Sequence, residues 1–367
     1  MRDLRRLATE SFFPIRSHGA RRELDGIRGI AILIVFLGHI LLFDPKLPQF
    51  IGSFGQVGVY LFFVLSAFLL TDIMIKESAA YPWKSVVLAF IVRRVLRIFP
   101  MYYFSLMLLN IFPQFAHMMF GGRMFSNLRH FLLIYPEGNY WAISVELEFY
   151  LMVPLFTAFV LSAKKIGKMP VVLFLICTAL FFSRLVAYFL VFPLNFPHIL
   201  PYINVFVFGV LTASINYYFG ARIKMWPRSL MFLCSVISIS MFIILLPGIG
   251  INLLGFEWIF TANYSSYAGF AAFLLLFSAI FGSNSITKIY SSNFLGFVGS
   301  ISFSIYMLHV FVMSFFAGNL YVKYGIVAAA VIVFALTSAL SAFTFLLVER
   351  PFIKLGSIIS KLVHSWE

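Results

Sequence analysis

Long apolar runs fill this sequence, and several of them can form helices that cross a membrane. A helix needs about 20 residues, each adding about 1.5 Å, to cross a hydrocarbon core of roughly 30 Å. Only 11% of the residues are charged and 62% are hydrophobic, so the chain cannot supply a water-soluble surface of ordinary charge density. Because backbone groups in lipid must find hydrogen bonds within the protein, the sequence predicts an all-α fold, a polytopic transmembrane helix bundle.

Proline, glycine and charged residues divide the apolar sequence into about ten predicted helices. We place these helices near residues 26–43, 56–75, 86–112, 140–163, 169–192, 199–218, 228–247, 264–282, 294–317 and 325–349. The expected units are a basic amino-terminal segment of residues 1–25, a transmembrane domain of residues 26–349 and a tail of residues 350–367. No small-residue cleavage site follows the first apolar run, so we expect an uncleaved first helix rather than a signal peptide.

The basic residues indicate topology rather than a nucleic-acid partner. The formal net charge is +14, but lysine and arginine are dispersed between the apolar runs instead of gathering on one soluble face. They fall mostly on alternate connections. The opposite side carries only Lys46, Arg123, Arg129 and Lys323, with Arg184 inside the fifth predicted helix. The positive-inside rule therefore predicts that both termini are cytoplasmic.

Two features of the sequence carry weaker signals. The longest predicted outer connection, residues 113–139, either covers the outer mouth of a site or is a solvated loop. The two cysteines, Cys177 and Cys234, are far apart and lie in apolar runs, so they suggest neither a disulfide framework nor zinc ligands. We expect both to be packing residues, and we expect no metal.

Polar side chains at membrane depth are costly, so the few that occur are candidates for function. The first helix holds Arg28 and His39 eleven residues apart, which puts them on one helix face about 16 Å from each other. Asp25, one turn before Arg28, shares that face. The alternative is that Arg28 is a topology anchor and His39 a hydrogen-bonded packing residue.

The third predicted helix opens with a group of arginines at its cytoplasmic end. Arg93 and Arg97 are one turn apart on one face, and Arg94 can join them from the side. Guanidinium groups suit phosphates, so this group favours a nucleotide-bearing ligand such as a coenzyme. Anionic lipid headgroups are the alternative partner.

Two further helices carry polar residues in their apolar sequence. Glu146 and Glu148 are about 200° apart on the fourth predicted helix, so one faces a cavity and the other needs a protein partner or stays protonated. In the ninth, Ser302 and His309 are seven residues apart and share a face, with Tyr306 beside them. A lone His309 is more often structural.

Helix direction gives these residues an expected depth. His39 and His309 are each roughly 20 Å from the inner boundary, and Glu146 is about one and a half turns below the outer one. We therefore expect an imidazole and carboxylate layer in the outer half and the arginines at the inner mouth. This arrangement suits a protein that takes a phosphate-bearing reagent from the cytoplasm and reacts it outward.

The same residues resemble the motifs of the acyltransferase family 3 integral membrane proteins, which include bacterial O-acetylases of O-antigen (lipopolysaccharide), exopolysaccharide, peptidoglycan and nodulation factors. The resemblance spans nearly the whole chain. Its motifs are LDGIRGIAILIVFLGH with Arg28 and His39, RRVLRIFPMYY, YWAISVELEFYLMVP with Trp141, SFSIYMLH, and VERPF at 348–352. The family often has two adjacent acids, whereas here Leu147 takes the second place, so Glu146 is the preferred carboxylate.

This resemblance implies an integral O-acyltransferase of the bacterial inner membrane. Acyl-CoA, most commonly acetyl-CoA, would be the cytoplasmic donor, and a hydroxyl of a surface carbohydrate or lipid-linked glycan the acceptor. Arg28, Arg93, Arg94 and Arg97 would hold the coenzyme's phosphates. His39 would be the general base or would be transiently acylated.

The remaining residues have supporting roles in this hypothesis. Glu146 would orient an imidazole or the acceptor, and His309 would complete a polar layer with Trp141, Ser302 and Tyr306. Some relatives carry a further extracytoplasmic esterase-like domain after the membrane part, whereas this sequence ends about 18 residues past the tenth predicted helix. We therefore expect any second transfer step to need another protein. A secondary transporter is the competing class, although neither broken half-helices nor repeated topology is evident. A structural scaffold is disfavoured by the cost of its buried ionisable groups.

Overall fold

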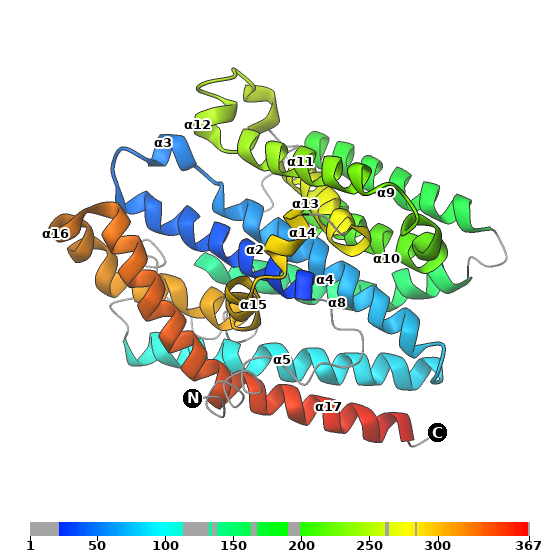
Figure 1. Ribbon diagram of the computed structural model, residues 1–367. Helices are drawn as coiled ribbons and strands as arrows, with labels where there is room; N and C mark the ends of the chain where they lie inside the picture. Colours follow the sequence, from blue (N-terminus) through cyan, green and yellow to red (C-terminus); the bar gives the residue numbers. More distant parts are fainter. Residues whose placement is uncertain are drawn as a thin grey trace.

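The computed structural model describes residues 22–112, 131, 133, 138–162, 167–189, 199–260, 264–282 and 285–365. Every regular element in these ranges is a helix, which confirms the predicted all-α class (Figure 1). The longer helices are α2 (Arg22–Ile40), α4 (Gly55–Glu77), α5 (Trp83–Ile111), α8 (Trp141–Ser162), α9 (Lys168–Phe189), α10 (Ile203–Ile223), α11 (Arg228–Ile244), α13 (Tyr264–Phe281), α16 (Ser302–Thr344) and α17 (Arg350–Ser365).

Short helical pieces connect the longer helices. The α-helical pieces are α3 (Pro48–Ile51), α12 (Pro247–Gly250), α14 (Ser285–Tyr290) and α15 (Asn293–Ser300). The 3-10 pieces are η1 (Leu41–Phe43), η2 (Gly138–Tyr140), η4 (Leu200–Tyr202) and η5 (Glu257–Phe260), and η6 (Phe345–Glu349) is a π-helical turn. The amino-terminal residues 1–21, most of the predicted outer connection 113–139, and the side chain of Arg184 lie outside the described residues.

The protein is an integral membrane protein. Within the described ranges, six helical stretches are long and apolar enough to cross a membrane: Arg22–Phe43, Pro48–Glu77, Gly138–Ser162, Leu200–Ile223, Tyr264–Phe281 and Ser302–Ser365. Each of the ten predicted segments overlaps a helix in these ranges. Fewer helices meet the length and hydropathy requirements for a membrane span than the ten predicted. One reason is that α5 carries four basic residues, and another is that the apolar parts of α9 and α11 are shorter.

The long helix α16 contains a reversal of the chain at Gly325, where φ is 80°. Val312 and Val333 belong to one buried cluster with Phe36 of α2, and Phe36 packs edge-on against Phe334 at 5.1 Å. In a straight helix, Val312 and Val333 would be roughly 30 Å apart. The two parts of α16 therefore fold against the same end of α2, which accounts for the predicted ninth and tenth helices as separate segments (Figure 1).

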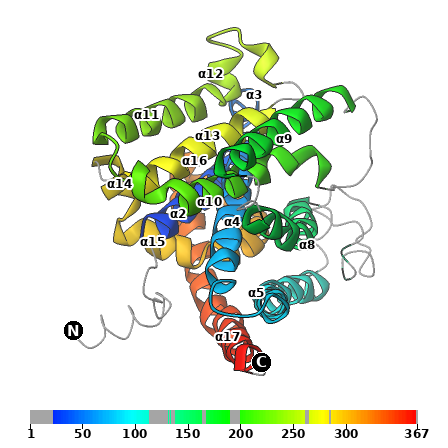
Figure 2. The same ribbon diagram turned by 90° about the vertical axis from the view of Figure 1, so that its right-hand side faces the viewer.

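The predicted tail is a helix in its own right. After η6 the chain continues into α17, which lies alongside α5 at one edge of the bundle (Figure 2). Gly356 of α17 packs near the backbone of Arg93 and the side chain of Leu96. His364, near the end of α17, stacks on Tyr81 at 3.9 Å and forms a 2.9 Å hydrogen bond with Ser85. Residues 350–365 thus brace the helix that carries the arginines.

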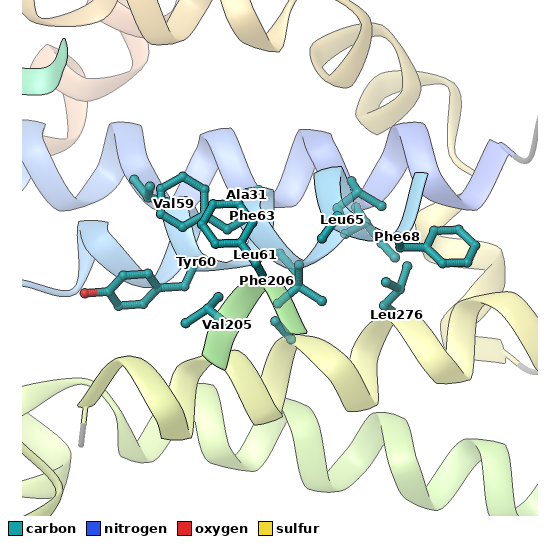
Figure 3. Close-up of a cluster of buried hydrophobic side chains, with 14 of the residues drawn as sticks. Ala31, Val59, Tyr60, Leu61, Phe63, Leu65, Phe68, Val205, Phe206 and Leu276 are labelled. Carbon is teal, nitrogen blue, oxygen red and sulfur yellow. The ribbon is translucent and has the colours of Figure 1, made fainter. Parts of the chain in front are cut away.

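The centre of the bundle is α4, which packs against α2, α10 and α13. Its apolar residues cover all sides rather than one stripe, as is typical of a fully surrounded helix. Phe63 of α4 stacks on Phe206 of α10 at 4.5 Å (Figure 3). Phe206 also stacks on Phe149 of α8 at 4.2 Å. The cysteines do not share this core: Cys177 is exposed, so its predicted packing role is wrong, and Cys234 is half-buried.

Close backbone contacts fix α2 against the short helix α15. A Cβ atom added at Gly299 of α15 would lie 1.9 Å from the Asp25 carbonyl oxygen, and one added at Gly29 would lie 2.4 Å from the Leu295 carbonyl oxygen. Small residues let membrane helices approach closely. Here they set the position of the helix face that carries Asp25 and Arg28.

The Gly299→Ala substitution should destabilise the fold by at least about 1–3 kcal/mol, because the new methyl group must displace backbone rather than a flexible side chain. Thermal unfolding of the detergent-solubilised protein measures the effect. Gly318→Ala is the matched control, since nothing lies within 4 Å of the added Cβ atom there. Equal melting temperatures for the two variants would contradict the close contact.

Candidate functional site

A pocket inside the bundle collects polar residues from five helices. It contains about 690 Å³ of space free of protein atoms, part of which is open to solvent. The polar residues that line it are Arg28 of α2, Ser66 of α4, Arg97 of α5, Glu146 and Tyr150 of α8, and Ser302 and Tyr306 of α16. Five of these, all except Ser66 and Tyr150, are residues that the sequence singled out. They are far apart in the chain, and the helix packing brings them to one site.

The carboxylate of Glu146 is held in a fixed position. Ser66 donates a hydrogen bond of 2.6 Å to one of its oxygens, and Tyr150, one turn along α8, donates another of 2.8 Å to the same oxygen. Arg28 and Arg94 both interact electrostatically with it. Glu146 therefore belongs with the arginines, so the predicted outer layer of carboxylate and imidazole is wrong for this residue. The position of α8 along its axis, relative to α2 and α5, places Glu146 beside the arginines. Helix periodicity in the sequence does not determine that position.

The guanidinium groups around the pocket lack full partners. The one ion pair that Arg28 makes with a described residue is with Asp25, at 3.8 Å. Arg97 has no hydrogen bond to, and no ion pair within 4 Å with, any residue in the described ranges. The Nε atom of Arg94 is buried without a partner there. Uncompensated positive charge inside a bundle is costly, so this site favours an anionic ligand.

Arg94 lines a second pocket and not the central one. The second pocket, between α5 and α8, is lined by Arg94 and Glu148 together with Tyr150, which also lines the first. Glu148 accepts a 2.9 Å hydrogen bond from the backbone N–H of Ile199. The two carboxylates of α8 thus divide as their spacing predicts, one toward the central pocket and the other toward a protein partner.

Arg93 has a different environment from the other arginines. Its guanidinium forms a 2.6 Å ion pair with Glu77 at the end of α4 and also donates a hydrogen bond to Ser360 of α17. It does not line the central pocket. Its contacts join three helices, so the structure gives Arg93 a bracing position and separates it from Arg97, with which the sequence grouped it.

His39 and His309 meet beyond Tyr306. Their rings pack edge-on with centroids 5.0 Å apart, and the His309 ring lies 5.8 Å from that of Tyr306. Neither histidine is among the residues that line the central pocket, whereas Tyr306 is. The structure confirms that Arg28 and His39 share a face of α2 and that Ser302 and His309 share a face of α16. Arg28 and Ser302 line the same pocket, and the two histidines contact each other further along these helices.

Backbone carbonyls define the protonation of both imidazoles. The Nδ1 atom of His39 lies 2.8 Å from the Val35 carbonyl oxygen, and that of His309 lies 2.8 Å from the Tyr306 carbonyl oxygen. A carbonyl oxygen only accepts hydrogen bonds, so Nδ1 must carry the proton in each ring. Neutral rings in this tautomer have a lone pair on Nε2, and the His309 Nε2 is buried without a partner among the described residues. Such a nitrogen can take a proton from a substrate.

Tyr306 is locked in place by the segment before α8. Its hydroxyl donates a 2.5 Å hydrogen bond to the Asn139 carbonyl oxygen, and the Asn139 side chain donates a 2.9 Å bond to the Tyr306 carbonyl oxygen. Trp141, two residues further on, packs against Tyr202 at 5.2 Å and Phe63 at 6.0 Å. Trp141 therefore supports this wall from an aromatic cluster and does not line the pocket.

Fold and site together define an integral membrane protein with an arginine-lined pocket inside a helix bundle. The family described as acyltransferase domain matches residues 21–347, and the chain belongs to it. Similar proteins include the peptidoglycan O-acetyltransferase OatA of Listeria monocytogenes, 26% identical over 92% of this chain and 56% of that protein. The O-acetyltransferase OatA of Staphylococcus aureus is 24% identical over 91% of this chain and 57% of that protein.

The similarity has a limited extent. The chain spans a little over half the length of these two relatives. Nodulation protein 10 of Rhizobium leguminosarum bv. viciae is 26% identical over 42% of this chain and 49% of that protein. No solved structure matches the chain. The family membership favours group transfer over the transporter alternative.

The Arg97→Gln substitution should weaken binding of coenzyme A about 10- to 100-fold, because a hydrogen bond to a charged group contributes about 1.5–3 kcal/mol. Arg93→Gln is the matched control and should leave the affinity within about threefold, since its guanidinium already has protein partners. Isothermal titration calorimetry on the purified protein measures both. An equal loss for the two variants would contradict the separation of the arginines.

Proposed function

We propose that this protein transfers an acyl group, most simply acetyl, from cytoplasmic acyl-CoA to a hydroxyl group of an extracytoplasmic glycan. The observation that carries the proposal is the site itself. Incompletely paired guanidinium groups line a pocket, and the same pocket reaches Tyr306, behind which lie two imidazoles whose Nε2 atoms carry the lone pair. This arrangement suits a donor with phosphates at one end and a reactive acyl group at the other.

Arg28 and Arg97 would bind the phosphates of the donor, with Arg94 beside them. The donor's flexible arm would then extend past Ser302 and Tyr306 toward the histidines. Glu146, fixed by Ser66 and Tyr150, would offset the repulsion between the guanidinium groups and so keep them together at the pocket. This role replaces the one that the sequence suggested for Glu146, because the carboxylate lies with the arginines.

His39 is the proposed general base. Its Nε2 would take the proton of the acceptor hydroxyl while that oxygen attacks the thioester carbonyl carbon. The new C–O bond forms, the C–S bond breaks, and the proton passes from the imidazolium to the departing thiolate to give free coenzyme A. His309 lies against His39 and would accept a hydrogen bond from the imidazolium that forms. A transient acyl group on His39 Nε2 would be the two-step version of the same reaction.

The acceptor and the location belong to the proposal as well. The two OatA relatives carry the name O-acetyltransferase, and one of them is named for peptidoglycan. A surface polysaccharide or a lipid-linked glycan is the corresponding acceptor class here, and the bacterial inner membrane the corresponding location. Cytoplasmic termini, as the distribution of lysine and arginine predicts, would put the arginines on the donor side.

The His39→Ala substitution should lower acyl transfer at least about 100-fold, because a general base contributes about 10²–10⁴-fold to rate. Mass spectrometry of surface glycans from cells with the wild-type or variant gene measures the added acyl group. His364→Ala is the matched control, since this histidine lies on α17 near Tyr81. Acylation retained by a folded His39→Ala protein would remove this residue from the central role, and unchanged glycans without the gene would reject the function.

A further inference from the structure

Glu349 is a buried carboxylate that the proposed reaction does not use. It is the last residue of the π-helical turn η6, where the end of α16 passes into α17, and only 1% of it is exposed. A buried carboxylate is costly unless charged groups and hydrogen bonds compensate it. A π-helical turn inside a longer helix is often found at a functional site. The partners of Glu349 therefore decide what this turn does.

These partners belong to the walls of the central pocket. Ser304 of α16 donates a 2.9 Å hydrogen bond to the Glu349 carboxylate, and Ser304 lies between the pocket residues Ser302 and Tyr306. Arg97 of α5 and Arg28 of α2 both interact electrostatically with the same carboxylate. Glu349 does not line the pocket itself. It thus links the two arginines to the pocket wall without occupying the space where a ligand would bind.

We propose that Glu349 is a positioning residue for the donor site, one that balances the charge of the guanidinium groups of Arg97 and Arg28 from behind the pocket wall and so keeps them together until an anionic donor binds. The inference rests on the proposed function only in naming the anion as the phosphates of acyl-CoA. Glu349 acts on Arg97 at longer range than an ion pair, because η6 packs against α5 while Arg97 has no hydrogen bond to, and no ion pair within 4 Å with, any described residue, Glu349 included.

Charge repulsion explains why the position of Glu349 matters. Arg28, Arg94 and Arg97 interact electrostatically with one another, and like charges at close range in a site of low dielectric repel strongly. Glu146 offsets this repulsion from α8, and Glu349 offsets it from the joint between α16 and α17. Without Glu349, the guanidinium groups would separate and no longer converge on one ligand.

The Glu349→Gln substitution tests the proposal, because glutamine keeps the volume and an acceptor oxygen for Ser304 but removes the charge. The Kd for coenzyme A, measured by calorimetry on purified protein, should rise about tenfold. The KM for acetyl-CoA should rise similarly while kcat changes less than about twofold, since Glu349 does not touch the reacting atoms. Glu349→Asp, which keeps the charge, should restore part of the affinity. Glu257→Gln, at an exposed glutamate, is the matched control.

A double-mutant cycle then tests whether Glu349 acts through Arg97. In the Arg97→Gln background, adding Glu349→Gln should change the Kd for coenzyme A less than about threefold. Independent, multiplying effects would overturn the proposal, and so would an unchanged Kd in a folded Glu349→Gln protein. If that variant does not fold, Ser304→Ala, which removes the hydrogen bond to the Glu349 carboxylate, should raise the Kd, and an unchanged Kd would overturn the proposal.

The two proposals fail in different ways. If the wild-type protein binds coenzyme A but no glycan gains an acyl group, the proposed function fails, and the role of Glu349 is still judged by the Kd. If the wild-type protein binds no coenzyme A, both fail. If acyl transfer is present but Glu349→Gln changes neither Kd nor KM, the positioning role alone is rejected.

Discussion

Positive charge enclosed within a helix bundle is the constraint on which the rest of this structure depends. A guanidinium group at membrane depth costs several kcal/mol unless carboxylates, hydrogen bonds or a ligand compensate it. Asp25, Glu146 and Glu349 lie near the arginines and offset part of that cost. The offset is incomplete, because the Arg94 Nε is buried with no hydrogen-bond partner among the described residues. The remaining excess of positive charge favours the binding of an anion. In this way the fold supports the proposed chemistry.

The packing of the bundle serves the position of these charges. Glycine contacts bring α2 close to α15 and so fix Arg28. On the other side, α17 braces α5 through Arg93, which joins Glu77 and Ser360. The three arginines in five positions therefore have three environments. Arg93 joins helices, Arg97 lines the central pocket, and Arg94 lines the second pocket, between α5 and α8. The surrounding helices thus give Arg93 a structural position and leave Arg97 facing the pocket, although both belong to one short motif.

Sequence reasoning predicted what depends on helix periodicity. The apolar runs gave the helices, and spacings of eleven and seven residues correctly put Arg28 with His39 on one face and Ser302 with His309 on another. The spacing of Glu146 and Glu148 likewise predicted their different surroundings. These inferences hold because they need only the geometry of one helix.

What depends on how helices are staggered could not be predicted. Glu146 lies beside the arginines because of how α8 packs against α4 in the bundle, whereas the sequence separated this carboxylate from them. Ser66 and Tyr150 escaped notice because serine and tyrosine are ordinary residues in membrane helices, and only their contact with Glu146 distinguishes them. Glu349 looked like the end of the last helix, although an acid directly after an apolar run was a signal that it is buried.

The most direct test of the account is an experimental structure of the protein with coenzyme A bound in a lipid nanodisc. The account predicts phosphate density against Arg28 and Arg97, with the arm of the coenzyme passing Tyr306 and its thiol within hydrogen-bonding distance of the His39 Nε2. Coenzyme A bound away from these arginines, or a closed wall between the pocket and the two imidazoles, would contradict it.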